Sequence, residues 1–191
     1  MKIQLDSVYE RDMDFLFMRK LAHDKDFVRQ FFLSGRELIE KGYDKADFSI
    51  INVAHSVMTE DGESDIEAVL SIEGKKVALL IEDKIDAIAQ PEQASRYRER
   101  GNKGLADGDY DEYYIFIVAP KIYLNTNDEA RNYPYSVSYE EVLNYFENKN
   151  DSRSVFKASQ IKQAICIFMF TSLARQTSQI YIFFFSFSQT L

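Results

Sequence analysis

Tryptophan is absent from the 191-residue chain, and cysteine occurs once, at Cys166. A single cysteine excludes an internal disulfide and suits a reducing compartment, so we expect a cytoplasmic protein. The N-terminal residues lack the apolar segment of a secretory signal peptide. The sequence also has no glycine-rich phosphate loop, no zinc-finger spacing and no pattern typical of a Ser-His-Asp triad.

Basic residues are in the minority, with 23 Lys and Arg against 31 Asp and Glu and a formal net charge of −8. This balance argues against a protein that coats nucleic acid by bulk attraction. It does not argue against an enzyme whose own site is acidic because it holds cations. Aromatic residues make up 14% of the chain, so we expect a folded core rather than disorder.

The hydrophobic periodicity predicts an α/β protein with a central mixed sheet of about four strands flanked by helices, in the order α-β-β-β-α-β. Unbroken apolar residues in the last strand favour a parallel crossover. The predicted strands cover residues 48–58, 64–72, 76–85 and 113–118. The predicted helices cover residues 7–22, 24–42 with a break near Ser34, 92–100 with Gly101 as the stop, and 138–147. Asp61–Gly62 is a turn signal.

Charged residues open the second predicted strand and close the third. Residues two apart on a strand share a face, so Glu82 and Lys84 project together and the Asp83 side chain projects oppositely. A two-residue turn at Glu73–Gly74 places Asp65 opposite Glu82, whereas a turn at Gly74–Lys75 places it opposite Lys84. In either register Asp65, Glu82 and Lys84 share one face.

Two carboxylates at the spacing of opposed strand residues repel each other unless a cation lies between them. Mg²⁺ suits this position because it prefers carboxylate and water oxygens, and Mn²⁺ can substitute for it. A metal held by Asp65, Glu82 and the backbone carbonyl of Asp83 would polarise a phosphodiester and activate water. Lys84 would orient that water or offset charge on the phosphate.

The pattern S-D at residues 64–65, I-E-D-K at residues 81–84 and Q-x-x-Q-x-x-R-Y at residues 90–97 resembles the PD-(D/E)XK nuclease superfamily, which has the restriction-endonuclease-like fold. The local sequence around Glu82–Lys84 is similar to sequences of a small bacterial and phage branch of this superfamily. The usual proline before the aspartate is replaced by Ser64. The resemblance implies a metal-dependent phosphodiesterase, either an endo- or an exonuclease, with nucleic acid, preferably DNA, as its substrate.

The same resemblance implies roles for individual residues. Asp65, Glu82 and Lys84 match the metal-binding and catalytic positions, and Gln93 or Tyr97 matches a supporting position on the following helix. Glu10 matches a metal ligand on the first helix, although it can equally complete a capping box with Ser7, and Asp14 can take its place. Arg96, Arg100 and Lys103, with Tyr97, are candidates for contact with nucleic acid; a solvated helix surface is the alternative.

We expect a nuclease-like domain over residues 1–150 and an apolar tail over residues 151–191, which either packs on the domain or is unrelated to it. Its apolar runs are each too short to span a bilayer, so a membrane partner is not favoured. A homodimer is compatible with the sequence. The alternative function is a catalytically inactive nuclease fold that serves as a binding or assembly module.

Overall fold

A computed structural model describes residues 7–59, 62–87 and 90–188, and their side chains except those of residues 56–63 and 175–188. Five strands form one mixed sheet in the order β1-β2-β3-β4-β5. They are β1 (Phe48–Thr59), β2 (Gly62–Ile72), β3 (Lys75–Asp83), β4 (Glu112–Ala119) and β5 (Tyr135–Ser138). Strands β1 to β3 are antiparallel, and β4 and β5 continue parallel to β3. The predicted α/β fold with a mixed sheet is confirmed, with β5 as an additional short strand.

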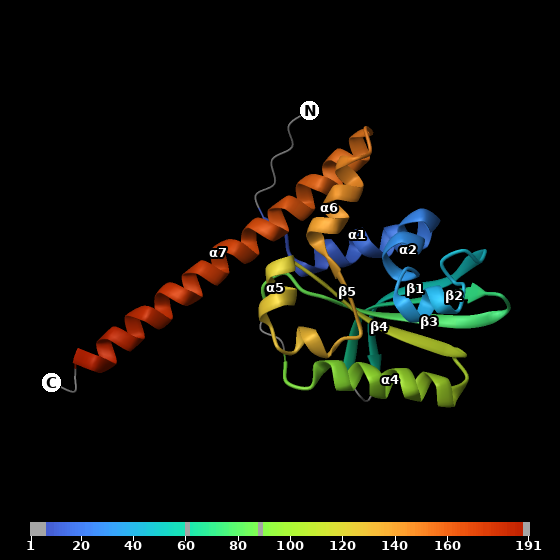
Figure 1. Cartoon of the computed structure of the whole chain (residues 1–191), viewed down its shortest axis with the longest axis horizontal. Coiled ribbons are helices and arrows are strands. Elements are labelled where there is room, and N and C mark those ends of the chain that lie inside the picture. The colour runs from blue at the N-terminus through green and yellow to red at the C-terminus, as the bar shows by residue number, and fades with distance from the viewer. Residues whose placement is uncertain (1–6, 60–61, 88–89, 189–191) are drawn as a thin grey trace.

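Helices cover both faces of the sheet (Figure 1), with α4 on one side and α1, α2 and α6 on the other. The helices are α1 (Glu10–His23), α2 (Lys25–Phe32), α3 (Arg36–Glu40), α4 (Gln93–Asp107), α5 (Lys121–Thr126), α6 (Tyr139–Glu147) and α7 (Ser152–Ser188), with a 3₁₀ turn η1 (Ala130–Asn132). The predicted break near Ser34 separates α2 from α3. The predicted turn at Asp61–Gly62 lies partly outside the described residues.

Strand β3 alternates between two apolar cores. Leu79 and Ile81 belong to the core under α1, α2 and α6, whereas Ala78 and Leu80 belong to the core under α4. Since side chains alternate along a strand, Glu82 continues the α4 side and Asp83 the opposite side. The end of β3 therefore presents one carboxylate to each face of the sheet.

The turn between β2 and β3 fixes which residues oppose each other. Glu73 and Gly74 both have positive φ, 50° and 83°, as a tight two-residue hairpin turn requires. Ile72 pairs with Lys75, and Ile66 pairs with Ile81 at the far end. This register corresponds to the first of the two predicted alternatives and brings Asp65 alongside Glu82.

Helix α4 extends beyond its predicted stop at Gly101. Gly101 and Gly104 lie inside the helix. A Cβ at Gly101 would come within 2.3 Å of the Tyr113 ring, and one at Gly104 within 2.2 Å of the Tyr110 ring. The helix ends instead at Gly108, whose φ is 77°. The predicted stop was wrong because these glycines permit close packing against β4 and the loop before it.

The start of α1 also differs from the prediction. The backbone N–H of Tyr9, rather than that of Ser7, donates a 2.9 Å hydrogen bond to Oδ2 of Asp12, three residues later. Glu10 is thereby not part of a capping box. By contrast, the box predicted at the start of α6 is present, with Ser138 and Glu141 as its members.

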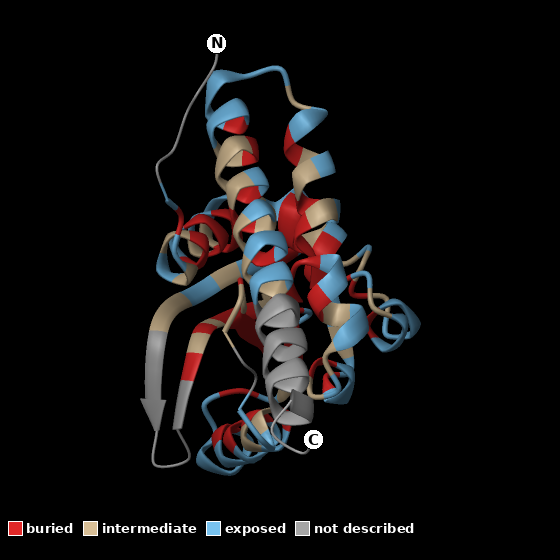
Figure 2. Cartoon of the chain, turned by 90° about the vertical axis from the view of Figure 1, so that its left-hand side faces the viewer, coloured by how far each residue is buried: buried red, intermediate tan, exposed pale blue. Residues whose placement is uncertain are grey.

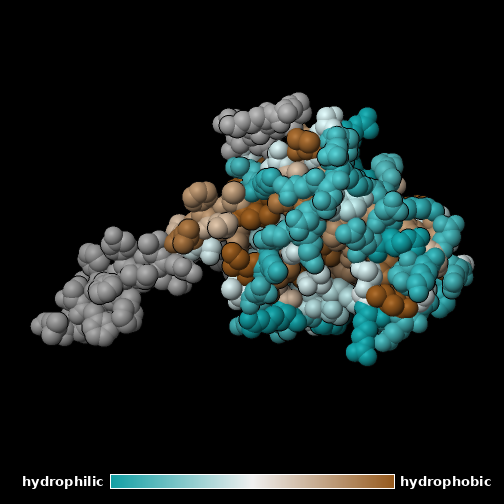
Figure 3. Space-filling view, turned by 45° about the horizontal axis from the view of Figure 1, so that its top comes forward, coloured by the Kyte–Doolittle hydropathy of each residue, from teal (hydrophilic) through white to brown (hydrophobic). Residues whose placement is uncertain are grey.

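Helix α7 begins on the domain and continues away from it (Figure 1). Its first half buries one side, at Ser154, Ala158, Ile161 and Ala164 (Figure 2). Apolar side chains are exposed where the helix leaves the domain (Figure 3), including Phe170 and Leu173. Among the described residues, no helix is long and apolar enough to cross a membrane. The boundary at residue 150 stays a prediction.

Candidate active site at the carboxyl end of β3

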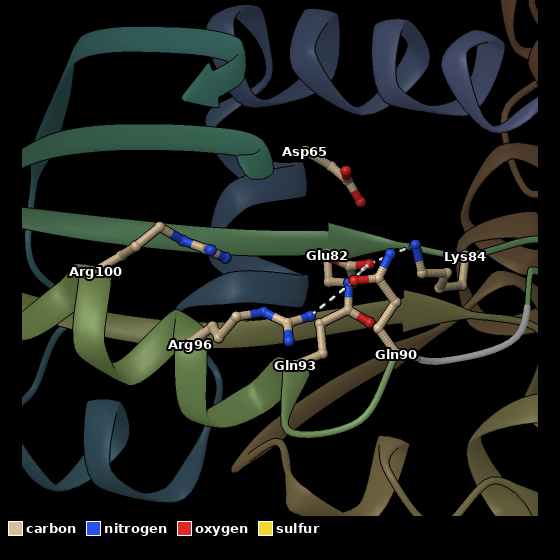
Figure 4. A pocket seen from close by; sticks show the side chains of 7 residues that line it. All are labelled: Asp65, Glu82, Lys84, Gln90, Gln93, Arg96 and Arg100. Atoms are coloured by element: carbon tan, nitrogen blue, oxygen red, sulfur yellow. Dashed lines mark hydrogen bonds and ion pairs between the residues drawn. The ribbon is translucent and has the colours of Figure 1, made fainter. Parts of the chain in front are cut away.

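A polar cleft of about 230 Å³ opens at the carboxyl end of β3, on the α4 side of the sheet (Figure 4). Its lining residues come from β2, β3, α4 and the loop before α4. They are Asp65, Glu82, Lys84, Gln90, Gln93, Arg96 and Arg100. The fold thus brings together side chains that the sequence separates by up to 35 positions.

Glu82 lies at the centre of the cleft and is only 1% exposed. Its Oε1 accepts from the Lys84 ammonium at 2.5 Å and from the amide of Gln93, and its Oε2 accepts from the Tyr97 hydroxyl at 2.6 Å. Burying a carboxylate costs several kcal/mol unless charge and hydrogen bonds compensate, so these donors are what allow an anion here. Gln93 and Tyr97, one helical turn apart on α4, position the Glu82 side chain.

Asp65 leans over the end of β3. Its Oδ2 accepts a 2.9 Å hydrogen bond from the backbone N–H of Asp83, and its own N–H donates to the Tyr97 hydroxyl at 3.2 Å. Burial, followed by repulsion from Glu82, raises the pKa of Asp65 to about 8. The Asp65 carboxyl group therefore ionises more readily when a cation enters the cleft.

Lys84 remains a cation in this environment. Burial opposes its charge, but attraction from Glu82, and then from Asp65 and Glu10, raises the pKa of its ammonium group above the ordinary value. A permanently protonated lysine donates hydrogen bonds and offsets negative charge, and it is unsuited to removing a proton from water. Both roles predicted for Lys84, orientation of water and compensation of charge on the phosphate, require the protonated form and stay predictions.

Acidic residues on α1 lie behind the cleft, on the other side of β3. Glu10 accepts a 3.0 Å hydrogen bond from the backbone N–H of Ile85. Asp14 lies 3.1 Å from Nε2 of His55, and burial raises its pKa to about 6, with further contributions from Glu10 and Glu82. Glu10 therefore holds the chain just after the Glu-Asp-Lys triplet.

The predicted basic residues follow one side of α4, at intervals of four and three positions. Arg96 is tied to the side chain of Gln90 and the carbonyl of Pro91, and Lys103 is exposed. Arg100 is 5% exposed and lies inside the cleft, with its guanidinium 4.0 Å from the centre of the Tyr97 ring. These three residues offer positive charge along the route into the cleft.

Tyr97 has an exposed fraction of 0%. A fully buried ring cannot touch nucleic acid in this conformation, so the predicted contact of Tyr97 with nucleic acid is wrong here. The reason is its hydrogen bond to Glu82, which turns the ring beneath the cleft instead of towards solvent.

The donor set fits a hard divalent cation. In residues 7–59, 62–87 and 90–188, no three His, Cys, Asp or Glu side chains are grouped so as to hold a metal ion by themselves. Asp65 and Glu82 nevertheless form the kind of two-carboxylate site in which Mg²⁺ keeps water and substrate oxygens as its other ligands. The position of both carboxylates in one cleft, with Asp65 alongside Glu82, is the observation that favours a cation between them.

One lining residue of the cleft and one residue packed behind it are not apparent from the strand pattern. Gln90 lines the cleft, and only its spacing of three from Gln93 could have indicated this. Tyr133 packs edge-on against Tyr97, with ring centroids 5.8 Å apart. No local pattern marks Tyr133, because it follows η1 and meets Tyr97 only through the fold.

A mixed α/β sheet with paired carboxylates and a lysine at one strand end matches the core that the sequence resemblance implies. A family model described as the PD-(D/E)XK nuclease superfamily matches residues 14–170, and the chain belongs to this superfamily. Its members are in general phosphodiesterases that act on nucleic acid and typically use divalent metal ions. No curated protein and no solved structure matches the chain.

Proposed function

We propose that this protein is a Mg²⁺-dependent nuclease that hydrolyses phosphodiester bonds, with DNA as the favoured substrate and Mn²⁺ as a substitute ion. The convergence of Asp65, Glu82 and Lys84 in one polar cleft supports this proposal most strongly. Membership of the PD-(D/E)XK superfamily supports the same reaction class.

Asp65 and Glu82 would hold the divalent ion, with the backbone carbonyl of Asp83 as a further ligand. When bound, such an ion lowers the pKa of a water molecule and offsets charge on the phosphate. Gln93 and Tyr97 keep the Glu82 carboxylate in place through their hydrogen bonds. The contact of Glu10 with Ile85 favours a supporting role for this residue over direct metal binding.

Lys84 acts on the substrate as a fixed positive charge. Its ammonium group lies on the same face as Glu82 and stays protonated, so it can donate to a phosphate oxygen or orient the attacking water. Arg96 at the cleft and Lys103 further along α4 would contact the backbone of the nucleic acid, as a sequence-independent electrostatic interaction.

The test is cleavage by the purified full chain of supercoiled plasmid, linear duplex, single-stranded DNA and RNA, with Mg²⁺, with Mn²⁺ and with EDTA. We expect metal-dependent cleavage of DNA that Lys84→Ala strongly reduces. Survival of every substrate would contradict the proposal. If calorimetry then still detected metal binding, the inactive binding module would become the better account.

A further inference from the structure

Arg11, Phe15 and Arg19 form an exposed stripe along α1, at intervals of four residues. Residues four apart lie on the same side of a helix, so the stripe extends over roughly 12 Å from its first to its last residue. The Arg11 guanidinium lies 5.5 Å from the centre of the Phe15 ring, and Phe15 is 44% exposed. The stripe therefore presents an aromatic ring and positive charge to the solvent.

His55, on β1, enlarges the aromatic surface of this stripe. The centroids of its ring and of the Phe15 ring are 5.3 Å apart, and the two planes are inclined by 36°. Nε2 of His55 lies 3.1 Å from Oδ2 of Asp14, and this contact fixes the orientation of the imidazole. Phe15 thus rests against an oriented second ring while one part of it stays open to solvent.

The positive charge of the stripe is not neutralised by the protein, although the whole chain has a formal net charge of −8. Within the described part of the chain, the side chains of Arg11 and Arg19 form no ion pair and no hydrogen bond. By contrast, the exposed Arg36 on α3 is paired with Glu40. Two guanidinium groups on either side of an exposed ring therefore remain available to an anion.

Two backbone contacts place the start of the stripe next to the active-site cleft. The first turn of α1 accepts a hydrogen bond from the N–H of Ile85, the residue after Lys84. On the neighbouring strands, His55 pairs with Ile66, the residue after Asp65. The stripe therefore begins beside the end of the sheet at which the cleft opens, and it continues away from the cleft along α1.

We infer that Arg11, Phe15 and Arg19, with His55, bind a single strand of nucleic acid that extends out of the cleft. An unpaired base can stack on the exposed Phe15 ring, whereas the bases of a duplex are already stacked on each other. The guanidinium groups on either side of the ring suit phosphates of the same strand. This inference rests on the proposed function, and it specifies a substrate with unpaired bases next to the cut.

The binding test requires no turnover and uses fluorescence anisotropy with Ca²⁺ in place of Mg²⁺. The probes are an oligothymidylate strand and a hairpin duplex of DNA. Phe15→Ala should weaken binding of the single strand by roughly 5- to 100-fold and change binding of the duplex little, because only the strand offers a base for stacking. Phe15→Trp should bind the strand at least as tightly as the wild type, and Phe15→Leu as weakly as Phe15→Ala. Equal weakening for strand and duplex, or full binding by Phe15→Leu, would overturn the stacking role.

A strand with abasic positions separates stacking from contacts with the backbone. The wild type should bind this strand more weakly than oligothymidylate, and Phe15→Ala should bind the two strands equally. Arg11→Gln and Arg19→Gln should each lower the slope of log affinity against log salt concentration by about 0.7, the contribution of one phosphate contact on a single strand. If these variants keep the affinity and the salt slope of the wild type, the stripe does not bind the strand.

Two matched variants and a folding measurement control these tests. Phe170→Ala removes a ring that is 74% exposed on α7, and Arg36→Gln removes an exposed arginine paired with Glu40. Both should bind as the wild type does, and thermal unfolding should show that the Phe15 variants remain folded. Loss of strand binding in Phe15→Ala, in a protein that cleaves no substrate, would refute the nuclease function and keep the binding stripe. Metal-dependent cleavage with unchanged strand binding in every stripe variant would refute the stripe alone.

Discussion

Glu82 and Asp83 are adjacent residues with the same 1% exposure, yet they lie in different environments. Glu82 faces the cleft and is held by Lys84, Gln93 and Tyr97. Asp83 faces the opposite core, where Tyr139 donates to its Oδ1 at 2.7 Å. Its Oδ2 has no hydrogen-bond partner within the described part of the chain.

The difference shows that a buried acid at a strand end is not by itself a catalytic group. Burial, followed by repulsion from Asp14, raises the pKa of Asp83, so its side chain favours the neutral form. Glu82 instead has a neighbouring ammonium group and access to the cleft. Consecutive residues of β3 face opposite sides of the sheet. Only the carboxylate on the cleft side can contact a substrate.

The largest expected effect is on the cleavage rate, which should depend on the carboxylate of Glu82 far more than on that of Asp83. Glu82→Gln should reduce the cleavage rate by about 1,000-fold or more, because it removes the charge proposed to bind the metal ion, an interaction worth several kcal/mol. Asp83→Asn keeps the backbone carbonyl and lies outside the cleft, so it should retain activity within about 10-fold. Equal losses in single-turnover cleavage assays would remove the distinction between the two faces.

Lys84→Met should lower kcat by roughly 100- to 1,000-fold, since it deletes a fixed donor to developing negative charge. Because the pKa of Lys84 is raised, the wild-type rate should show no step from lysine titration near neutral pH. A pH–rate profile of both proteins checks this. A wild-type profile requiring deprotonated Lys84 would contradict the role assigned to it.

Metal affinity should depend on pH through Asp65. The carboxyl group has a pKa of about 8 in the folded protein, so below this pH a metal ion must displace a proton. The Mn²⁺ association constant should therefore rise by about 10-fold per pH unit between pH 6 and 8 and then level off. Calorimetry of Asp65→Asn should show weaker binding without this slope; an unchanged slope would assign the proton to another group.

The smallest expected effect is on the free energy of unfolding, and it comes from Asp14 on α1. The pKa of Asp14 is about 6 in the folded protein against an ordinary 3.8, so the folded state binds this proton more tightly than the unfolded state. The free energy of unfolding should consequently fall as pH rises from about 4 to 6 and stay lower above pH 6. Asp14→Asn should remove this fall and stabilise the protein at pH 7 by roughly 1–3 kcal/mol. Urea unfolding of wild type and Asp14→Asn at pH 4 and pH 7 measures these free energies. If the two proteins differ by the same free energy at both pH values, the raised pKa does not belong to Asp14.

Strand periodicity was sufficient to place Asp65, Glu82 and Lys84 on one face before the fold was known. It could not choose between two hairpin registers, because that choice depends on the positive φ of Glu73 and Gly74. A glycine in a polar segment also reads as a helix stop. Gly101 is instead required because the ring of Tyr113, in the following strand β4, packs against it. A local sequence pattern cannot predict this tertiary contact.

The other features that the sequence did not predict depend on contacts between residues far apart along the chain. Strand β5 has only four residues and depends on pairing with β4. Tyr133 packs against Tyr97 because the segment after α5 lies beside α4, to which Glu129 and Asn132 are hydrogen-bonded. Tyr97 is buried, and its hydroxyl donates to Glu82. Local sequence predicts which side chains can do the chemistry, whereas tertiary contacts decide which of them face the cleft.

The most direct test of the central claim is a crystal structure of the full chain soaked in Mn²⁺, with the ion located by anomalous scattering. The account predicts a peak in the cleft, in contact with carboxylate oxygens of Asp65 and Glu82. A peak on the opposite side of β3, between Asp14 and Asp83, or no peak at a saturating concentration of Mn²⁺, would contradict it.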